Sequence, residues 1–332
     1  MLNNKNIFIT GGTGSFGKAF VKKVLKNYKP NKLVIYSRDE LKQFEMRQEF
    51  PKKKFPSLRF LLGDVRDRYR LKIALRDINI VVHAAAQKHV EASEYNPEEC
   101  IKTNIKGAEN VVYGCIENKV EKVISLSTDK AVNPINLYGA TKLVSDKLFV
   151  SANIISGKQK TVFSVVRYGN VLNSRGSVIP YFKKLISEKK NFLPLTHKSM
   201  SRFIISLDDG VDFVINSLKK MYGGEIFVPK IPAIRIIDLI KALKSDIKIK
   251  VIGIKPGEKL HEVLCPKDEN SQIIEFKKFY LIAPTIDTNV KRKKYFIQKN
   301  GEKGKIVNED FEYSSDKVKL LKVSDIQKLL DK

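Results

Sequence analysis

The chain of 332 residues contains no tryptophan, three cysteines and four histidines. Cys100, Cys115 and Cys265 are odd in number and lack CxxC spacing, so neither a disulfide framework nor a cysteine zinc site is expected. The histidines form no HExxH pair, and we expect no metal. No run of about 18 apolar residues is present, so we expect no membrane-spanning helix. The N-terminal residues enter a strand-like stretch without a signal-peptide hydrophobic region, which leads us to expect a cytoplasmic protein.

Acidic residues are also scarce: 36 Asp and Glu stand against 62 Lys and Arg, and the formal net charge is +26. This balance suggests a polyanionic partner: nucleic acid, an acidic membrane or phosphorylated small molecules. A nucleic-acid-binding face needs basic residues clustered with aromatic ones. The lysines here are spread along the whole chain, so we expect no nucleic acid and no membrane partner.

Short apolar runs alternate with helical patterns in the first half of the chain. This alternation is typical of a parallel sheet covered on both faces, and it predicts a doubly wound Rossmann α/β fold. The predicted strands are 6–10, 32–37, 58–64, 80–85, 120–127 and 161–167, and the first predicted helices are 14–28 and 40–50.

After residue 170 the predicted strands become short and isolated, at 203–206, 225–228 and 250–252. We therefore expect an NADP-binding domain over residues 1–170 and a smaller substrate-binding α/β domain over residues 171–332. The two are expected to be partly interleaved, with part of residues 200–230 returning to the first.

A glycine-rich segment joins the first predicted strand to the first predicted helix with the spacing GxxGxxG. Glycine permits a tight turn and lets backbone N–H groups approach a pyrophosphate at a helix N-terminus. The alternative is an ordinary glycine-rich turn, but the strand–turn–helix context favours a dinucleotide site. The candidate contacts are Gly11, Thr13, Gly14, Ser15, Phe16 and Gly17.

The end of the second predicted strand indicates which dinucleotide binds. An acidic residue there favours NAD, whereas this chain has Ser37 and Arg38, with Lys42 one helical turn later. Two cations can neutralise a ribose 2′-phosphate, so we expect NADP rather than NAD; the alternative is ordinary surface charge. Asp64 and Val65 follow the third strand and suit an adenine contact, although Asp also commonly caps a helix.

Tyr138 and Lys142 match YxxxK, a spacing that places both side chains on one face of a helix. A neighbouring ammonium lowers the pKa of a phenol, which can then exchange protons with a sugar hydroxyl. Other Tyr–Lys pairs share the spacing, but only this one begins a helix directly after a strand of the dinucleotide domain.

The fifth predicted strand ends in Thr128, Asp129 and Lys130. Residues at the carboxyl end of a parallel strand face the ligand crevice. A carboxyl and an amine beside the Tyr138 phenol can together move several protons, so we predict a catalytic cluster. The alternative for the Asp–Lys pair is a solvated turn.

The GGTGSFG loop, the helix-borne YGATK and the six-strand pattern resemble the extended short-chain dehydrogenase/reductase superfamily, in its nucleotide-sugar-modifying branch. Longer strings resemble the C5-inverting UDP-N-acetylglucosamine 4,6-dehydratases of pseudaminic acid biosynthesis. These strings are STDKA with NPINLYGATK, VVRYGNV with SRGSVIP, GGEIFVPK, PGEKLHEV and FEYSS, and the resemblance runs nearly end to end.

The resemblance implies that NADP⁺ takes a hydride from sugar C4 and returns it to C6 after water is lost across C5 and C6. Tyr138 with Lys142 would deprotonate the C4 hydroxyl, while Thr128 would hydrogen-bond the C4 oxygen. Asp129 would protonate the leaving C6 hydroxyl, and Lys130 would be the base at C5. Because the base must be neutral, we expect Lys142 and the cationic nicotinamide ring to lower the pKa of Lys130.

The resemblance also implies contacts elsewhere, although for any single residue the alternative is packing or surface charge. Along the cofactor it places Ala84, Ala85, Ala86, Asn104 and Val171. Around the UDP-sugar it places Lys88, Asn170, Arg175, Ser177, Thr196, Arg202, Lys255 and Glu258. Lys255 stands where an Arg is expected, so affinity for the pyrophosphate is in question. A homo-oligomer is implied, with a hexamer as the expected state, and the product would serve flagellin glycosylation or a surface polysaccharide.

Other functions stay open. A nucleotide-sugar 4-epimerase needs the Tyr–Lys pair but no acid–base pair, so Asp129 and Lys130 argue against it. A C5-retaining dehydratase commonly carries Glu after the Thr-Asp, where this chain has Lys130. A Rossmann-like nucleic-acid-binding protein is the remote alternative.

Overall fold

The computed structural model describes residues 1–157, 161–174, 176–288 and 290–330. At its centre is a ten-stranded sheet, of which seven neighbouring strands are parallel. In spatial order these are β3 (Leu58–Leu62), β2 (Lys32–Ser37), β1 (Asn6–Thr10), β4 (Ile80–His83), β5 (Lys122–Thr128), β6 (Val162–Tyr168) and β10 (Ile226–Pro229). The order 3-2-1-4-5-6 is that of a Rossmann sheet, which confirms the predicted fold class.

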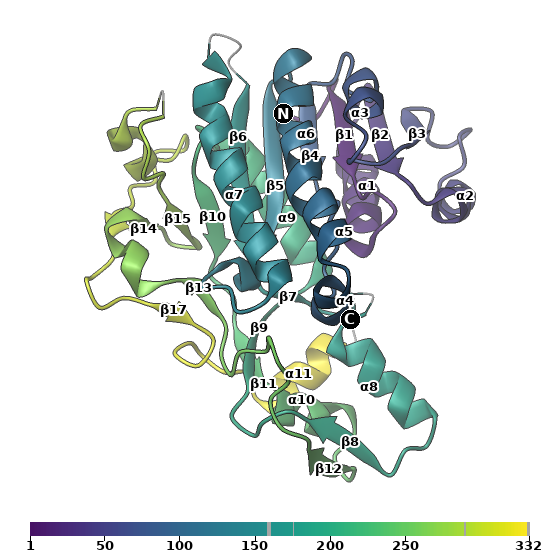
Figure 1. Cartoon of the computed structure of the whole chain (residues 1–332), viewed down its shortest axis with the longest axis vertical. Coiled ribbons are helices and arrows are strands. Elements are labelled where there is room, and N and C mark those ends of the chain that lie inside the picture. Colours follow the sequence, from purple (N-terminus) through teal and green to yellow (C-terminus); the bar gives the residue numbers. More distant parts are fainter. Residues whose placement is uncertain (158–160, 175, 289, 331–332) are drawn as a thin grey trace.

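The predicted strands agree with the observed ones to within two residues, because continuous apolar runs must be buried on both faces of a parallel sheet. One face is covered by α1 (Ser15–Asn27), α2 (Glu40–Glu49) and α9 (Leu207–Lys220). The other face, toward the viewer in Figure 1, is covered by α3 (Arg68–Ala74), α6 (Gly107–Glu117) and α7 (Leu137–Ile155).

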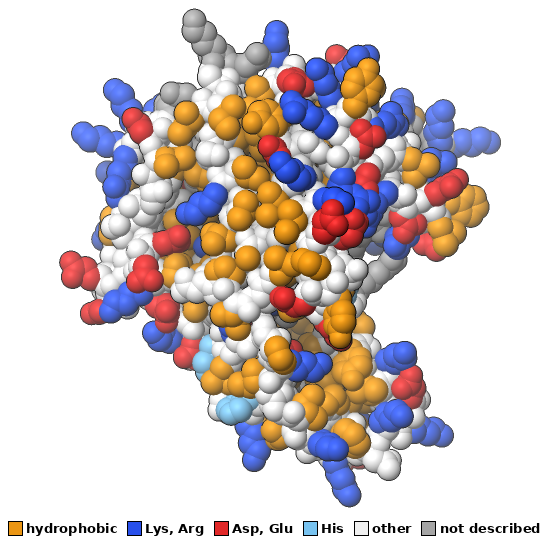
Figure 2. All heavy atoms as spheres, viewed as in Figure 1, with side chains coloured by type: hydrophobic (Ala, Val, Ile, Leu, Met, Phe, Trp, Pro, Cys, Tyr) orange, Lys and Arg blue, Asp and Glu red, His pale blue; other side chains and the backbone are white. Residues whose placement is uncertain are grey.

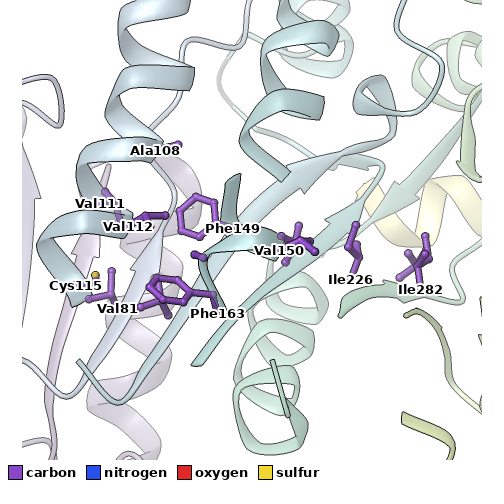
Figure 3. Packing of buried hydrophobic residues seen from close by; sticks show 14 of the residues in the cluster. Val81, Ala108, Val111, Val112, Cys115, Phe149, Val150, Phe163, Ile226 and Ile282 are labelled. Carbon is purple, nitrogen blue, oxygen red and sulfur yellow. The ribbon is translucent and has the colours of Figure 1, made fainter. Parts of the chain in front are cut away.

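The core between α7 and the sheet is built on aromatic side chains (Figure 3). Phe149 of α7 and Phe163 of β6 are fully buried, with ring centroids 6.3 Å apart. Val150 of the same helix packs toward Ile226 and Ile282 on the neighbouring strands. Each fully buried side chain of this kind contributes about 1.5–3 kcal/mol, so this layer fixes α7, and with it Tyr138 and Lys142, against the sheet.

The antiparallel edge of the sheet comes from late in the sequence. It consists of β15 (Phe279–Ile282), β14 (Ile273–Glu275) and β16 (Lys305–Ile306). Residues 207–229 also return to the sheet as α9 and β10. The chain therefore alternates between the sheet and the smaller part below it in Figure 1.

That smaller part has apolar clusters of its own, one around Ile204, Leu239 and Ile326 and another around Phe182, Leu193 and Ile240. Its helices are α8 (Val178–Ser187), α10 (Ile236–Leu243) and α11 (Val323–Leu330). Its strands form a three-stranded sheet in the order β11 (Ala233–Arg235), β9 (Ser201–Ile205) and β7 (Asn170–Val171), and a pair of β12 (Lys248–Val251) with β8 (Phe192–Leu195). A further pair, β13 (Val263–Cys265) with β17 (Tyr313–Ser314), contributes buried residues to the core of the main sheet.

Short helical segments complete the chain. They are α4 (Val90–Tyr95), α5 (Pro97–Ile101), the π-helical turn η1 (Lys102–Lys106), η2 (Asp129–Ala131), η4 (Lys267–Gln272) and η5 (Arg292–Phe296). All three cysteines are buried and unpaired with one another. Over the described ranges, no helix has the length and apolar character needed to cross a membrane.

Candidate active site

The glycine loop connects β1 to α1 and packs against the loop that follows β4. Gly11 adopts φ +64°, and a Cβ there would lie 2.9 Å from the carbonyl oxygen of Ala84 and the backbone of Ala85. A Cβ on Gly17 would lie 2.4 Å from the carbonyl oxygen of Gly12, so the start of α1 approaches the loop closely. Gly14 is exposed and directly precedes α1, whose first N–H groups have no partners within the helix. These features make a cradle suited to a pyrophosphate.

The remaining loop residues flank this cradle. Thr13 is 5% exposed, while Ser15 and Phe16 are half-buried in the first turn of α1. The Thr10 hydroxyl accepts hydrogen bonds from the N–H groups of Ala84 and Ala85, both at 3.1 Å. The ends of β1 and β4 are thus joined at the carboxyl edge of the sheet.

His83 lies behind this junction. Its Nδ1 is 2.8 Å from the Thr10 hydroxyl, and burial together with the charge of Lys142 lowers the pKa of His83 to about 3. The imidazole is therefore neutral at ordinary pH and has a packing and hydrogen-bonding role.

Asn104 fixes the next part of the same loop. Its side chain, 2% exposed in η1, accepts from the N–H of Gln87 at 2.8 Å and donates to the carbonyl of Gln87 at 2.9 Å. It also donates to the Thr141 hydroxyl at 3.0 Å, one residue before Lys142. Asn104 thus connects Gln87, which directly follows the run Ala84–Ala86, to helix α7.

The predicted adenosine contacts gather at the ends of β2 and β3. Ser37 is buried, and the Gln43 amide donates to its carbonyl and hydroxyl oxygens, both at 3.1 Å. The Arg38 side chain is 60% exposed and lies 3.5 Å from Asp64. Lys42 instead pairs with Asp39, the residue that caps α2. Arg38 is therefore the more available of the two predicted cations.

Asp64 is held in place by a neighbouring guanidinium. It accepts from the backbone N–H of Arg66 at 3.0 Å and from its Nε at 2.9 Å. Burial alone would raise the pKa of Asp64, but the hydrogen bonds and charge of Arg66 lower it. Val65 is buried against Gly107 at the start of α6, so this turn presents a fixed surface beside the loop.

The five predicted catalytic residues come together at the end of β5 and the start of α7. The Thr128 hydroxyl donates to Asp129 Oδ1 at 3.0 Å and lies next to the Tyr138 hydroxyl, whose pKa it lowers. The Asp129 side chain is 1% exposed, and Lys130 Nζ lies 3.1 Å from its Oδ1. One hydroxyl thus connects the phenol to the acid–base pair.

Tyr138 and Lys142 are both buried. Burial raises the pKa of Tyr138 to about 12, although the Lys130 charge and the Thr128 hydrogen bond oppose the rise. Burial lowers the pKa of Lys142, and the Asp146 carboxylate opposes that fall. The cation that acts on the phenol in this structure is therefore Lys130 and not the helical neighbour Lys142, and burial outweighs its effect, so the expectation of a lowered phenol pKa is wrong for this structure.

Our expectation that the pKa of Lys130 would be lowered is wrong for this structure. Burial acts in that direction, but the carboxylates of Asp129 and Glu262 outweigh it and raise the pKa of Lys130. Its ammonium lies 3.1 Å from an oxygen of each, so the group is held in its charged form. The sequence prediction considered only positive neighbours and missed the second carboxylate.

The predicted sugar- and phosphate-binding residues are spread over several elements. Lys88 follows β4, and partial burial lowers its pKa. Asn170 and Val171 form β7 next to β9 and are half-buried. Ser177 directly precedes α8, and Thr196 directly follows β8, both in the smaller part of the molecule. Arg175 lies outside the described residues.

Lys255 and Glu258 belong to a tight turn that reaches the start of α7. The N–H of Glu258 donates to the carbonyl of Lys255 at 3.1 Å. Gly257, at φ +77°, accepts from the Asn136 side chain at 2.8 Å, and Asn136 also caps α7. Lys255 is exposed, so its ammonium is available to a ligand at this end of the helix.

Arg202, predicted to hold the UDP-sugar, is largely committed to the protein. It donates to the carbonyl oxygens of Ser201 at 2.7 Å, Leu260 at 3.1 Å and Lys259 at 2.9 Å. Its Nε lies 3.7 Å from Glu262. The guanidinium therefore braces the segment that crosses the site.

The prediction omitted several residues that contact this cluster. Glu262 reaches Lys130, and Lys259 donates to the carbonyl of Val132 beside η2. Asp146 accepts from Ser127 at 2.7 Å below Lys142. PGEKLHEV contains two of these residues, but a separation of 132 positions from Lys130 to Glu262 gives no local signal. Across the described ranges, no group of three His, Cys, Asp or Glu side chains suits a metal ion.

Comparison with known proteins extends these findings. The model of the family described as "Polysaccharide biosynthesis protein" matches residues 7–284. The chain is 58% identical over 316 residues to the UDP-N-acetylglucosamine 4,6-dehydratase (inverting) of Campylobacter jejuni subsp. jejuni serotype O:2, covering 95% of this chain and 94% of that protein. It is 43% identical over 337 residues to a UDP-glucose 4-epimerase of Rickettsia bellii, covering 99% and 96%.

Solved structures agree on the architecture. The X-ray structure of Pen from Bacillus thuringiensis superposes with a TM-score of 0.88 at 37% identity, covering 99% of this chain and 98% of that one. The dTDP-glucose 4,6-dehydratase DesIV of Streptomyces venezuelae shares the fold, with a TM-score of 0.68 at 21% identity and coverage of 77% and 86%. The chain therefore belongs to the polysaccharide biosynthesis protein family, and its resemblance to the inverting UDP-N-acetylglucosamine 4,6-dehydratases of the short-chain dehydrogenase/reductase superfamily is confirmed.

Proposed function

We propose that the protein is an NADP-dependent UDP-N-acetylglucosamine 4,6-dehydratase that inverts C5, a lyase forming UDP-2-acetamido-2,6-dideoxy-β-L-arabino-hex-4-ulose. The observation that carries the proposal is the contact of Asp129 with Lys130 at the end of β5, with Thr128 connecting the pair to Tyr138. An acid and a base beside a phenol suit dehydration of a sugar next to an oxidised carbon. The 58% identity to an inverting dehydratase supports the same substrate.

The cofactor is assigned to the cradle between the β1 and β4 loops. The residues fit a dinucleotide, because at Gly11 a side chain would fill the space against Ala84 and Ala85. NADP⁺, when bound there, would supply the hydride acceptor for sugar C4, and its reduced form would supply the hydride donor for C6. Arg38 and Ser37 would hold the 2′-phosphate, and Asp64 with Val65 would border the adenine.

The protein's own residues would move the protons. Tyr138, kept in place by α7 and assisted by Lys142, takes the proton of the C4 hydroxyl, while Thr128 hydrogen-bonds that oxygen. Asp129 gives its proton to the C6 hydroxyl, which leaves as water. Lys130 takes the proton from C5, which the C4 ketone has made acidic.

Asp129 and Lys130 must therefore start as a carboxylic acid and a neutral amine. A single proton passing from the ammonium to the carboxylate across their 3.1 Å contact creates both forms at once. The elimination then consumes both and restores the ion pair seen in the structure. Acid and base are thus prepared together.

The UDP-sugar is assigned to the carboxyl edge of the parallel strands, next to the catalytic residues. Its binding residues would be Lys88, Asn170, Arg175, Ser177, Thr196, Lys255 and Glu258, with Arg202 as a brace. We further propose a homo-oligomer, a hexamer, and a place at the first step of pseudaminic acid biosynthesis. Light scattering of the purified protein tests the hexamer.

A 4-epimerase is the second candidate, because a relative at 43% identity carries that name. Proton NMR of the product from UDP-N-acetylglucosamine, with no added cofactor, separates the cases. A C6 methyl on an L-arabino 4-keto ring supports inversion, and the D-xylo ring indicates C5 retention. An intact C6 hydroxymethyl with altered C4 indicates an epimerase and contradicts our proposal.

A further inference from the structure

One ion-pair network in the site joins distant parts of the chain. Lys130 Nζ lies 3.1 Å from Asp129 Oδ1 and 3.1 Å from Glu262 Oε1. The Glu262 side chain is only 2% exposed, so its charge needs a partner inside the protein. Arg202 Nε, at 3.7 Å, provides only a longer contact to the same oxygen. Lys130 is therefore the nearest cation to a buried carboxylate that the proposed reaction steps do not use.

The backbone around Glu262 is fixed independently of Lys130. Its N–H donates to the Ser315 hydroxyl at 2.9 Å, and the N–H of Ser315 donates to the Glu262 carbonyl at 2.8 Å. The Ser315 hydroxyl lies 2.7 Å from that of Ser201. PGEKLHEV and FEYSS thus meet at this point. Their contact delivers the Glu262 carboxylate to the reaction centre.

We propose that Glu262 is a positioning residue for the dehydration: it holds the Lys130 side chain beside Asp129 and keeps its ammonium protonated until the C5 step requires the amine. This inference rests on the proposed function, because it concerns the base of that reaction. Glu262 acts through Lys130 and needs no contact with the sugar.

Charge on Lys130 depends on every ionisable group around it. From η2, α7, β9 and the 255–262 segment these groups are Asp129, Tyr138, Arg202, Lys259 and Glu262. Burial and Arg202 lower the pKa of Lys130, whereas the two carboxylates raise it. An opposite charge within about 4–6 Å shifts a pKa by about 1–3 units. Removing the charge of Glu262 therefore makes the neutral amine available at lower pH.

The test compares wild type with Glu262→Gln, which keeps shape and removes charge. The reactive acid–amine pair carries the same single proton as the ion pair, so kcat/KM falls as pH passes the pKa at which that proton is lost to solvent. We expect this alkaline limb of kcat/KM for UDP-N-acetylglucosamine to move about one pH unit or more toward acid. In the substrate-free enzyme, the pH midpoint for acetylation of Lys130, followed by peptide mass spectrometry, moves in the same direction.

Two further variants decide between explanations. Glu262→Asp keeps the charge but withdraws it by one methylene, so both shifts are smaller and in the same direction. Glu275→Gln removes a carboxylate of β14 that pairs with Lys230 at 2.6 Å. This control variant should leave the pH limb of kcat/KM and the acetylation midpoint of Lys130 unchanged. Should Glu262→Gln fail to fold, the Asp variant decides alone.

Folded Glu262 variants that keep the wild-type pH limb of kcat/KM and the wild-type acetylation midpoint of Lys130 would contradict this role of Glu262. A merely structural role would lower the unfolding temperature without moving either value. Failure of the proposed function has a different signature, since the wild-type enzyme itself would then give no C6-methyl product.

Discussion

Two regions meet in this site, and they differ in how far apart their residues lie in sequence. Along the sheet edge, Thr128, Tyr138 and Lys142 lie within one strand–helix unit. The region opposite is built from β9, the 255–262 segment and strand β17 with the following Ser315. The first region carries the assigned chemistry, and the second sets the charge around it. Here a local motif identifies the reaction, while a distant segment determines the protonation state of its base.

Removing the base tests the first region most directly. Lys130→Ala is expected to lower kcat by about 10²–10⁴-fold, because no other amine replaces it at C5. Exchange of the C5 proton with deuterated water, followed by NMR, should slow in parallel. Normal C5 exchange in the variant would show that another group is the base.

The cofactor cradle gives the next largest effect. Gly11 adopts φ +64°, and Gly11→Ala places a Cβ 2.9 Å from the Ala84 carbonyl oxygen. We therefore expect the free energy of unfolding to fall by about 3 kcal/mol and NADP⁺ to bind more weakly. Gly301→Ala is the matched control, because φ is +84° and no atom lies within 4 Å. For Gly301→Ala we expect the free energy of unfolding to fall by about 1 kcal/mol and NADP⁺ binding to stay unchanged. Urea unfolding measures the stability of each variant, and cofactor fluorescence measures its affinity for NADP⁺. Equal effects of the two substitutions on NADP⁺ affinity would contradict the assignment of the cofactor to the cradle.

Cofactor preference should depend on one exposed guanidinium. Arg38→Ala is expected to weaken NADP⁺ about tenfold and to leave NAD⁺ within twofold, because only the former has a 2′-phosphate. Lys42→Ala should do less, since Asp39 already engages that ammonium. Titration of each variant with both dinucleotides gives the ratio of the Kd for NADP⁺ to the Kd for NAD⁺. If Arg38→Ala leaves this ratio unchanged, the 2′-phosphate lies elsewhere.

The smallest effect is expected in the second region. Lys255→Arg provides a bidentate donor for a pyrophosphate and should lower KM for the UDP-sugar about threefold with kcat unchanged. Steady-state kinetics with UDP inhibition measures the change. A rise in KM, or a kcat effect alone, would indicate that residue 255 does not contact the pyrophosphate.

Basic charge is a poor guide to either region. Figure 2 shows Lys and Arg side chains scattered over the visible face among acidic ones, with apolar side chains along its centre. Only a few cations, such as Arg38 and Lys255, are assigned to the anionic ligands. The site's most consequential cation, Lys130, is neutralised by buried carboxylates and contributes little to such a surface.

Local sequence patterns predict the Rossmann sheet, the glycine loop and the grouping of Thr128, Asp129, Lys130, Tyr138 and Lys142. Strand periodicity and helix spacing are local properties, so a one-dimensional pattern suffices for them. Three further features emerge only in the folded molecule. Arg202 donates hydrogen bonds to the backbone, Asp39 forms an ion pair with Lys42, and Glu262 holds Lys130 in its charged form. These outcomes depend on burial and on charges brought together across 132 positions, and electrostatic energies depend on distance in space rather than along the chain.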